Sequence, residues 1–232
     1  MSTTDFQIVE VTDERTPMAD AALGLIGELF DPRDRQPLSE LRMEIAEKRL
    51  SLLAAYDCHC FAAADDQGSV AGMAMGVYLA GVNAGFVSYL AARPEYRGQQ
   101  LGHLLRGRLV EALRRNARLA GLNDLAWVLG EVRRGSPWLA RLVRERGALP
   151  FDVEYFHPGI GPGAAGGRWV LYRQPVTDHR ELLPAEEVRR VLFALYRRVY
   201  RIRYPLEHPG FAAMLVELAE QGSGGADQGP EG

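Results

Sequence analysis

Residues 69–79 are apolar on both of the faces that a β-strand presents. Successive side chains of a strand point to opposite sides, so each side can be read separately. Both sides consist of apolar residues here: Val70, Ala74 and Tyr78 on one, and Met73, Met75 and Val77 on the other. A strand that buries both faces lies inside a sheet that helices cover on each side. The segment therefore predicts an α/β fold with this strand near the centre of the sheet.

Strand and helix patterns on either side of this segment predict the other elements. Strand-like runs at residues 59–65 and 84–92 flank it through short polar turns, which indicates an antiparallel meander. Ser39 and Ser136 are expected to cap helix N-termini, and Gly147 a helix C-terminus. The remaining predicted elements are strands at residues 6–11, 125–132, 150–157 and 168–174, and helices at residues 19–30, 39–53, 101–121 and 137–147.

The last part of the chain has a different character from this compact unit. A helix is expected at residues 184–203 and a shorter one at residues 210–220. The longer helix has an apolar stripe of Val188, Val191, Leu192, Leu195, Tyr196 and Val199. Exposing so large an apolar stripe to water is unfavourable, so the helix must pack against its own chain or against a second copy in a homodimer. The predicted parts are a domain at residues 1–178, a helical extension at 179–220 and a disordered tail at 221–232.

The net charge and the hydropathy pattern argue against nucleic acid and membranes as partners of this chain. The net charge of -3 and the isoelectric point near 6.0 argue against nucleic acid, so the clustered arginines are interpreted as solvated helix faces. No apolar run reaches the roughly 18 residues of a membrane span, and the first ten residues lack a secretory signal pattern. A cytoplasmic location without membrane contact is expected. Cys58 and Cys60 flank His59, but no second ligand cluster accompanies them, so they are interpreted as buried apolar side chains and no metal is expected.

A strand leads almost directly into a helix at residues 87–105. The first turn of a helix has unpaired backbone N–H groups and the positive end of the helix dipole. Gly98 and Gly102 allow the backbone to approach a bulky anion, and Arg97 adds a charge-assisted contact. This junction is therefore predicted to bind a pyrophosphate.

The junction reads Arg97-Gly98-Gln99-Gln100-Leu101-Gly102. It resembles the acetyl-CoA motif of the GNAT acetyltransferase superfamily, Gln/Arg-x-x-Gly-x-Gly/Ala at a strand-to-helix junction, and the lead-in at residues 93–96 agrees with that family. Gln100 stands where the family usually has its first motif glycine, and an ordinary helical φ is expected for it, so that the amides still point at the ligand. The resemblance implies a GNAT-like α/β fold, with a mixed, mostly antiparallel sheet flanked by helices.

The resemblance also implies where the co-substrate acetyl-CoA lies. The family has a splayed gap between two strands, here at residues 84–92 and 125–132, in which the pantetheine arm pairs with strand backbone. One backbone amide there polarises the thioester carbonyl. Arg93 or Arg106 is expected to reach the adenosine phosphate. The predicted CoA-binding residues are Leu90, Ala91, Ala92, Arg97, Gly98, Gln99, Gln100, Leu101, Gly102, His103 and Ser136.

An amine that attacks a thioester must first lose a proton, so the site needs a base. The family often has a tyrosine at the position of Val143, so its usual proton donor is missing here. Glu131, at the carboxyl end of a strand bordering the gap, is the first candidate base, and the alternative is a rim carboxylate paired with Arg133. Tyr155 and His157, on the last hairpin, are candidate acids or bases.

These features predict an acetyl-CoA-dependent N-acyltransferase. It transfers the acetyl group directly to a primary amine of a small molecule or peptide, and residues 31–37 are expected to line the acceptor side without selecting a substrate class. The alternative is a non-catalytic CoA-binding regulatory or interaction module on the same fold. Gln100 and Val143 favour this alternative, whereas an intact cleft carboxylate and loop favour the enzyme.

Overall fold

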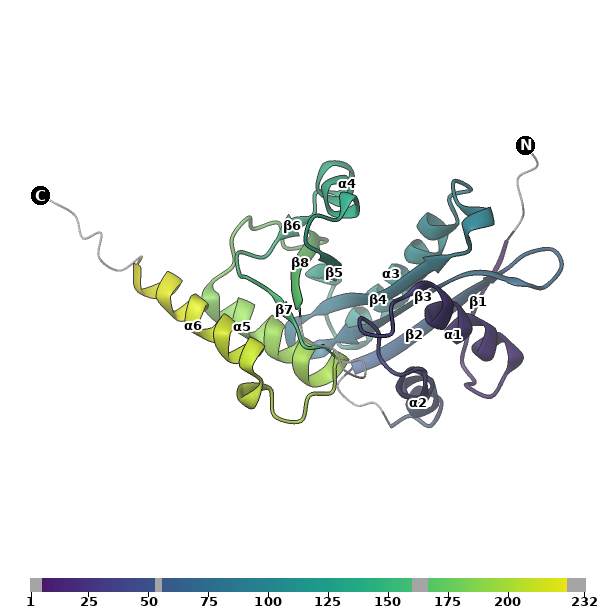
Figure 1. Cartoon of the computed structure of the whole chain (residues 1–232), viewed down its shortest axis with the longest axis horizontal. Coiled ribbons are helices and arrows are strands. Elements are labelled where there is room, and N and C mark those ends of the chain that lie inside the picture. The colour runs from purple at the N-terminus through teal and green to yellow at the C-terminus, as the bar shows by residue number, and fades with distance from the viewer. Residues whose placement is uncertain (1–5, 53–55, 160–166, 225–232) are drawn as a thin grey trace, which may run out of the picture.

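The computed structural model describes residues 6–52, 56–159 and 167–224, and Figure 1 shows a long sheet with helices on both faces. The described strands are β1 (Gln7–Glu10), β2 (Tyr56–Ala64), β3 (Val70–Leu79), β4 (Ala84–Ala92), β5 (Trp127–Arg133), β6 (Leu149–Pro150), β7 (Phe156–His157) and β8 (Gly167–Pro175). The described helices are α1 (Pro17–Leu29), α2 (Leu38–Arg49), α3 (Leu101–Leu119), α4 (Pro137–Arg146), α5 (Ala185–Ala194) and α6 (Pro209–Gly224). None of these helices is long and apolar enough to cross a membrane.

The sheet has the order β1-β2-β3-β4-β5-β8-β6, and β7 pairs with β8. Strands β2, β3 and β4 form the predicted antiparallel meander, and every residue of β3 is buried. Val70 lies on the opposite face from Ala74 and Tyr78, contrary to the predicted grouping. The reason is a bulge: Ala64 pairs with Val70 but Ala63 pairs with Gly72, so β3 has one extra residue and the alternation changes sides there.

Helix α3 covers one face of the meander, while α1, α2 and the C-terminal helices cover the other. The contact with α3 is close because glycines stand at the strand positions beneath it. A Cβ built on Gly72 would lie 3.0 Å from Leu105, and one built on Gly85 would lie 2.8 Å from Leu113. These glycines bring the helix that starts at the predicted pyrophosphate loop tightly against β3 and β4.

Several predicted boundaries are wrong for local reasons. Ser39 is not a cap, because α2 begins one residue earlier, after Pro37, and its N-terminus has no side-chain cap. Residues 150–157 do not form one strand: only β6 and β7 pair there. The predicted helix at residues 184–203 is α5 followed by a π-helical turn, Leu195–Val199, and it ends before Arg201, whose φ is 55°. In contrast, Ser136 and Gly147 cap α4 as predicted.

Strands β4 and β5 diverge after a short parallel pairing. Their ladder contains only Ala84 with Trp127, Gly85 with Val128 and Phe86 with Leu129. A bulge in β4 follows immediately, because Val87 pairs with Gly76 and Tyr89 with Met75, leaving Ser88 as the extra residue. The predicted gap between the two strands is therefore present at the carboxyl half of β4.

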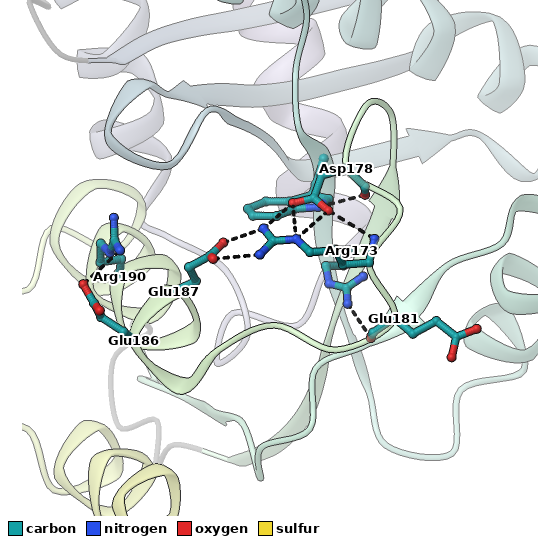
Figure 2. Close-up of polar contacts among 8 residues, drawn as sticks. Arg173, Asp178, Glu181, Glu186, Glu187 and Arg190 are labelled. Atoms are coloured by element: carbon teal, nitrogen blue, oxygen red, sulfur yellow. Dashed lines mark hydrogen bonds and ion pairs between the residues drawn. The ribbon is translucent and has the colours of Figure 1, made fainter. Parts of the chain in front are cut away.

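The C-terminal extension folds back onto the sheet. The predicted apolar stripe of α5 is buried in the main core cluster, and α6 lies beside α5 in Figure 1. Arg180 joins the connection to the helix by binding Asp178 (2.5 Å) and Glu187 (2.8 Å), the acids labelled in Figure 2. The extension thus packs against its own chain. Helix α6 continues to Gly224, past the predicted start of the tail, and residues 225–232 lie outside the described part.

Candidate active site

The start of α3 borders a cavity of about 800 Å³ between β4 and α4. Its lining includes most of the predicted CoA-binding residues: Leu90, Ala92, Arg97, Gly98, Gln100, Leu101, Gly102 and His103. Ala91 does not line it, because strand alternation turns its side chain into the core on the other face. Ser136 instead accepts a hydrogen bond from the backbone N–H of Trp138 at 3.3 Å and caps α4. Gln99 donates to the Glu95 carbonyl at 3.4 Å and is also outside the lining.

Gln100 adopts a left-handed conformation with φ 60° and ψ 6°, so the prediction of an ordinary helical φ is wrong. Glycine is the residue that reaches this region without a steric penalty, whereas a residue with a Cβ pays roughly 1–2 kcal/mol. The backbone at residue 100 therefore keeps the shape that a glycine would give it. Gly98, with φ 84°, also needs this region.

Positive charge reaches the cavity from two helices. Arg106 of α3 is 7% exposed and donates to Gln174 at 2.6 Å, and burial lowers the pKa of its guanidinium. Arg141 and Arg146 of α4 also line the cavity, although the sequence indicated only solvated helix faces for the arginines. Their spacing with Trp138, Leu142 and Glu145 follows one face of a helix, and this periodicity was the available signal.

Arg93 does not reach this cavity. Its guanidinium donates to the Val70 carbonyl and to Glu28, both at 3.0 Å. Of the two arginines expected near the adenosine phosphate, only Arg106 is in place to contact an anion in the cavity. The free amides of the α3 start, Arg97 and the arginines of α3 and α4 form a donor set that fits a multiply charged phosphate ligand.

A second, small cavity of about 70 Å³ lies where β4 bulges and β5 ends. The loop before α2 contributes Asp34 and Gln36, as the sequence indicated for residues 31–37. The other lining residues come from the end of α1, the two strands, the last hairpin and the C-terminal extension: Phe30, Phe86, Ser88, Tyr89, Glu131, His157, Trp169, Val199 and Tyr200.

Glu131 is the central acid of this cavity. Its side chain is 12% exposed, and its Oε1 lies 3.5 Å from Nε2 of His157. Its Oε2 is buried and makes no hydrogen bond of good geometry, and the hydroxyls of Tyr155 and Tyr200 are donors close to the carboxylate. The alternative pairing with Arg133 is not observed, because Arg133 binds Asp34 instead, with its Nε at 3.0 Å. Glu131 thus has an acceptor atom available to a ligand.

The contacts of His157 indicate which tautomer its neutral ring adopts. Its Nδ1 accepts a hydrogen bond from the backbone N–H of Gly159 at 3.1 Å. In a neutral imidazole the other nitrogen then carries the hydrogen, so Nε2–H faces Glu131. The ring stacks on Trp169 with centroids 4.9 Å apart, which fixes its orientation.

Two buried tyrosines complete the cluster. The Tyr155 hydroxyl donates to the Tyr200 hydroxyl at 3.4 Å. Burial, and next the charge of Glu131, raise the pKa of both phenols well above the ordinary value, so both stay protonated. The structure therefore brings together the three predicted catalytic residues, Glu131, Tyr155 and His157. Tyr200 was missed, since only tertiary folding brings the end of a helix 69 residues away toward Glu131.

Within the described part of the chain no group of three or more potential metal ligands is found. Cys58 and Cys60 are free and buried on the core side of β2, as the sequence indicated. Burial raises the pKa of both thiols, so neither is a reactive thiolate. The two cysteines are packing residues.

The central meander, the glycine-bearing start of α3 and the gap between β4 and β5 define the class of protein. Residues 25–131 match the family described as the acetyltransferase (GNAT) family. This segment of the chain is therefore similar to the GNAT acetyltransferases. Among curated proteins no sequence matches this chain.

Solved structures share this fold at low sequence identity. A protein assigned to the GNAT acetyltransferases from Bacteroides thetaiotaomicron is 17% identical with a TM-score of 0.59, over 84% of this chain and 99% of that one. An acetyltransferase-like protein from Acinetobacter baylyi is 14% identical with a TM-score of 0.54, over 76% and 96%. One assigned to the same family from Desulfovibrio desulfuricans is 16% identical with a TM-score of 0.52, over 74% and 99%. The TM-scores show a common fold, and at these identities the comparison does not indicate the substrate.

Proposed function

We propose that this protein is an acetyl-CoA-dependent N-acetyltransferase that transfers the acetyl group directly to a primary amine, with Glu131 as the proton acceptor. The observation that carries the proposal is Glu131 itself, a largely buried carboxylate that lines a cavity beside the splayed strands and whose Oε2 makes no hydrogen bond of good geometry. A buried acceptor without a donor is costly, and an amine N–H satisfies it. The match of residues 25–131 to the GNAT acetyltransferase family supports acetyl transfer as the reaction.

The first cavity supplies the binding site for CoA in this proposal. The amides at the start of α3, Arg97 and Arg106 hold the pyrophosphate and adenosine phosphate, and Arg146, which contacts His103 at 2.8 Å, adds positive charge. When bound, acetyl-CoA supplies an activated acetyl group as a thioester. The backbone of β4 after the bulge, at residues 90–92, pairs with the pantetheine arm because β5 has diverged there.

The second cavity prepares the amine. An ammonium ion has no lone pair, so its proton must pass to a base, and Glu131 Oε2 accepts it. His157 holds the carboxylate through Oε1, and its own orientation is fixed by Gly159 and Trp169. Tyr155 and Tyr200 keep their protons at neutral pH, and Tyr200, which lines the cavity, donates a proton to the CoA thiolate that leaves when the amine takes the acetyl group. Tyr200 stands in for the tyrosine that the family often has at the position of Val143, a residue that is 44% exposed on α4.

The test is release of CoASH from acetyl-CoA across a panel of primary amines. Glu131→Gln is expected to lower kcat by roughly 10²-fold or more while leaving CoA affinity unchanged, because the amide cannot take the proton. Glu111→Gln is the matched control, since Glu111 is exposed on α3 and pairs with Arg118. Unaltered kcat in Glu131→Gln removes the residue from the mechanism. CoA binding without amine-dependent release supports the non-catalytic alternative.

A further inference from the structure

A buried arginine lies beneath the C-terminal extension. Arg173 of β8 is 2% exposed and shares its strand face with Leu171, which packs in the same core cluster as α5. Figure 2 shows its guanidinium directed toward the connection that carries Glu181, whose carbonyl accepts from Nη2 at 2.6 Å. The other two guanidinium nitrogens, Nε and Nη1, have no hydrogen-bond partner among the described residues.

Three of the acidic residues nearby are engaged by other arginines. Asp178 and Glu187 both bind Arg180, and Glu186 binds Arg190 at 2.9 Å (Figure 2). Within the described chain no carboxylate lies within ion-pair distance of Arg173. A buried guanidinium with unpaired N–H groups is strongly unfavourable, and an arginine stays charged in such a place. An anion from outside the chain would satisfy both free nitrogens.

A cavity of about 230 Å³ gives access to this arginine. Its walls combine apolar and polar side chains, and the sheet, the connection and both C-terminal helices contribute to them. Cζ of Arg173 lies 5.8 Å from the centre of the Phe151 ring. The apolar part of the lining is formed by Phe151, Leu182, Leu183, Val188 and Leu218.

We infer that this cavity binds a small carboxylate with an apolar body. The planar guanidinium offers paired donors that match the two oxygens of a carboxylate, and the apolar part of the lining accepts a short branched chain. Asp152 and Glu181 also line the cavity, so an α-ammonium group next to the carboxylate would meet opposite charge. The carboxylate could thus belong to a simple acid or to an apolar amino acid. The cavity shares no lining residue with the CoA or the acceptor cavity, so this site is separate from both.

Isothermal titration of the full chain, saturated with CoA to occupy the other anion site, tests this inference. The probes are isovalerate, leucine, isoamylamine and inorganic phosphate at equal ionic strength. Isovalerate or leucine is expected to bind. At a concentration of one hundred times its Kd, the bound probe is expected to raise the Tm of the protein by about 5 to 10 °C. The stronger of the two identifies the source of the carboxylate. Isoamylamine, which lacks the carboxylate, is expected not to bind.

Two variants separate this site from general electrostatic attraction. Arg173→Met is expected to lower affinity at least 100-fold, while Arg190→Met, which removes an exposed charge from α5, leaves it unchanged. If Arg173→Met fails to fold, Ala185→Leu fills the cavity from α5 and is expected to abolish binding with the arginine intact. Binding of phosphate as strong as that of isovalerate overturns the inference, as does the absence of binding by both carboxylates.

Discussion

Glu44 is a buried carboxyl group whose pKa differs between the folded and the unfolded chain. It lies in α2 with 3% exposure, and its Oε1 is 3.6 Å from Nε of Arg201 at the end of the C-terminal extension. Burial raises the pKa of Glu44 from its ordinary value of 4.5 to about 7, against the opposing charge of Arg201. The folded chain therefore holds a proton there that the unfolded chain releases at lower pH.

This difference predicts a fall in stability as pH rises from 4.5 to 7. In that window the folded state binds more protons than the unfolded state, so the free energy of unfolding decreases with pH, by about 3 kcal/mol in total, and then stays level for this group. Denaturant unfolding of the wild type and Glu44→Gln at pH 5 and pH 8 measures it. Relative to the variant, the wild type should lose stability between the two values. An equal pH dependence of both proteins would contradict the assignment.

At the scale of elements, the first turn of α3 combines two features. Gln100 supplies a left-handed residue at the helix start, and two positions further on Gly102 faces open space, where a Cβ would meet no heavy atom within 4 Å. That open space belongs to the first cavity, which both residues line. The helix start is thus shaped to leave room for a ligand against its free amides.

Gly102→Glu and Gly102→Ala form a matched pair at this position. Alanine adds only a Cβ into open space and should retain CoA binding, whereas glutamate places a negative charge where the pyrophosphate lies and should weaken binding at least 100-fold. An acidic residue near a helix N-terminus does not weaken the helix, so the fold should survive. Calorimetric titration with CoA measures the difference. Equal affinity of the two folded variants would refute the loop assignment.

For the whole molecule, the C-terminal extension is both a cover for the core and a wall of the acceptor cavity. Leu192, Leu195 and Tyr196 are fully buried against the sheet, and Val199 and Tyr200 line the cavity around Glu131. Trp127 of β5 also donates to the Asp178 carbonyl at 3.2 Å, which ties the connection to the sheet. Stability and the acceptor site therefore depend on the same segment.

Truncation after Gln174 is expected to destabilise the protein and make it aggregate. It removes side chains that each contribute roughly 1.5 to 3 kcal/mol when fully buried, and it exposes the apolar sheet face beneath them. Thermal unfolding and light scattering of both forms measure the effect. Intramolecular packing further predicts a monomeric full-length protein. A truncated chain that is as soluble and stable as its parent would contradict this role.

The sequence by itself determined the order of elements, the central meander and the junction at residues 97–102, because strand alternation, helical periodicity and cap residues are local signals. It also indicated Glu131, Tyr155 and His157, which lie on one strand end and the hairpin beside it. The sequence did not indicate the face on which each strand residue lies, because no local signal revealed the bulge that moves Val70 to the other face of β3.

Only the tertiary structure decided how distant segments meet. Tyr200 reaches Glu131 and Arg173 is buried without an acid because helices far along the chain fold back on the sheet, and no local pattern encodes that contact. The left-handed backbone of Gln100 was likewise not indicated by any local pattern. Its local preference opposes this conformation by roughly 1–2 kcal/mol, so contacts made by the folded chain must hold it.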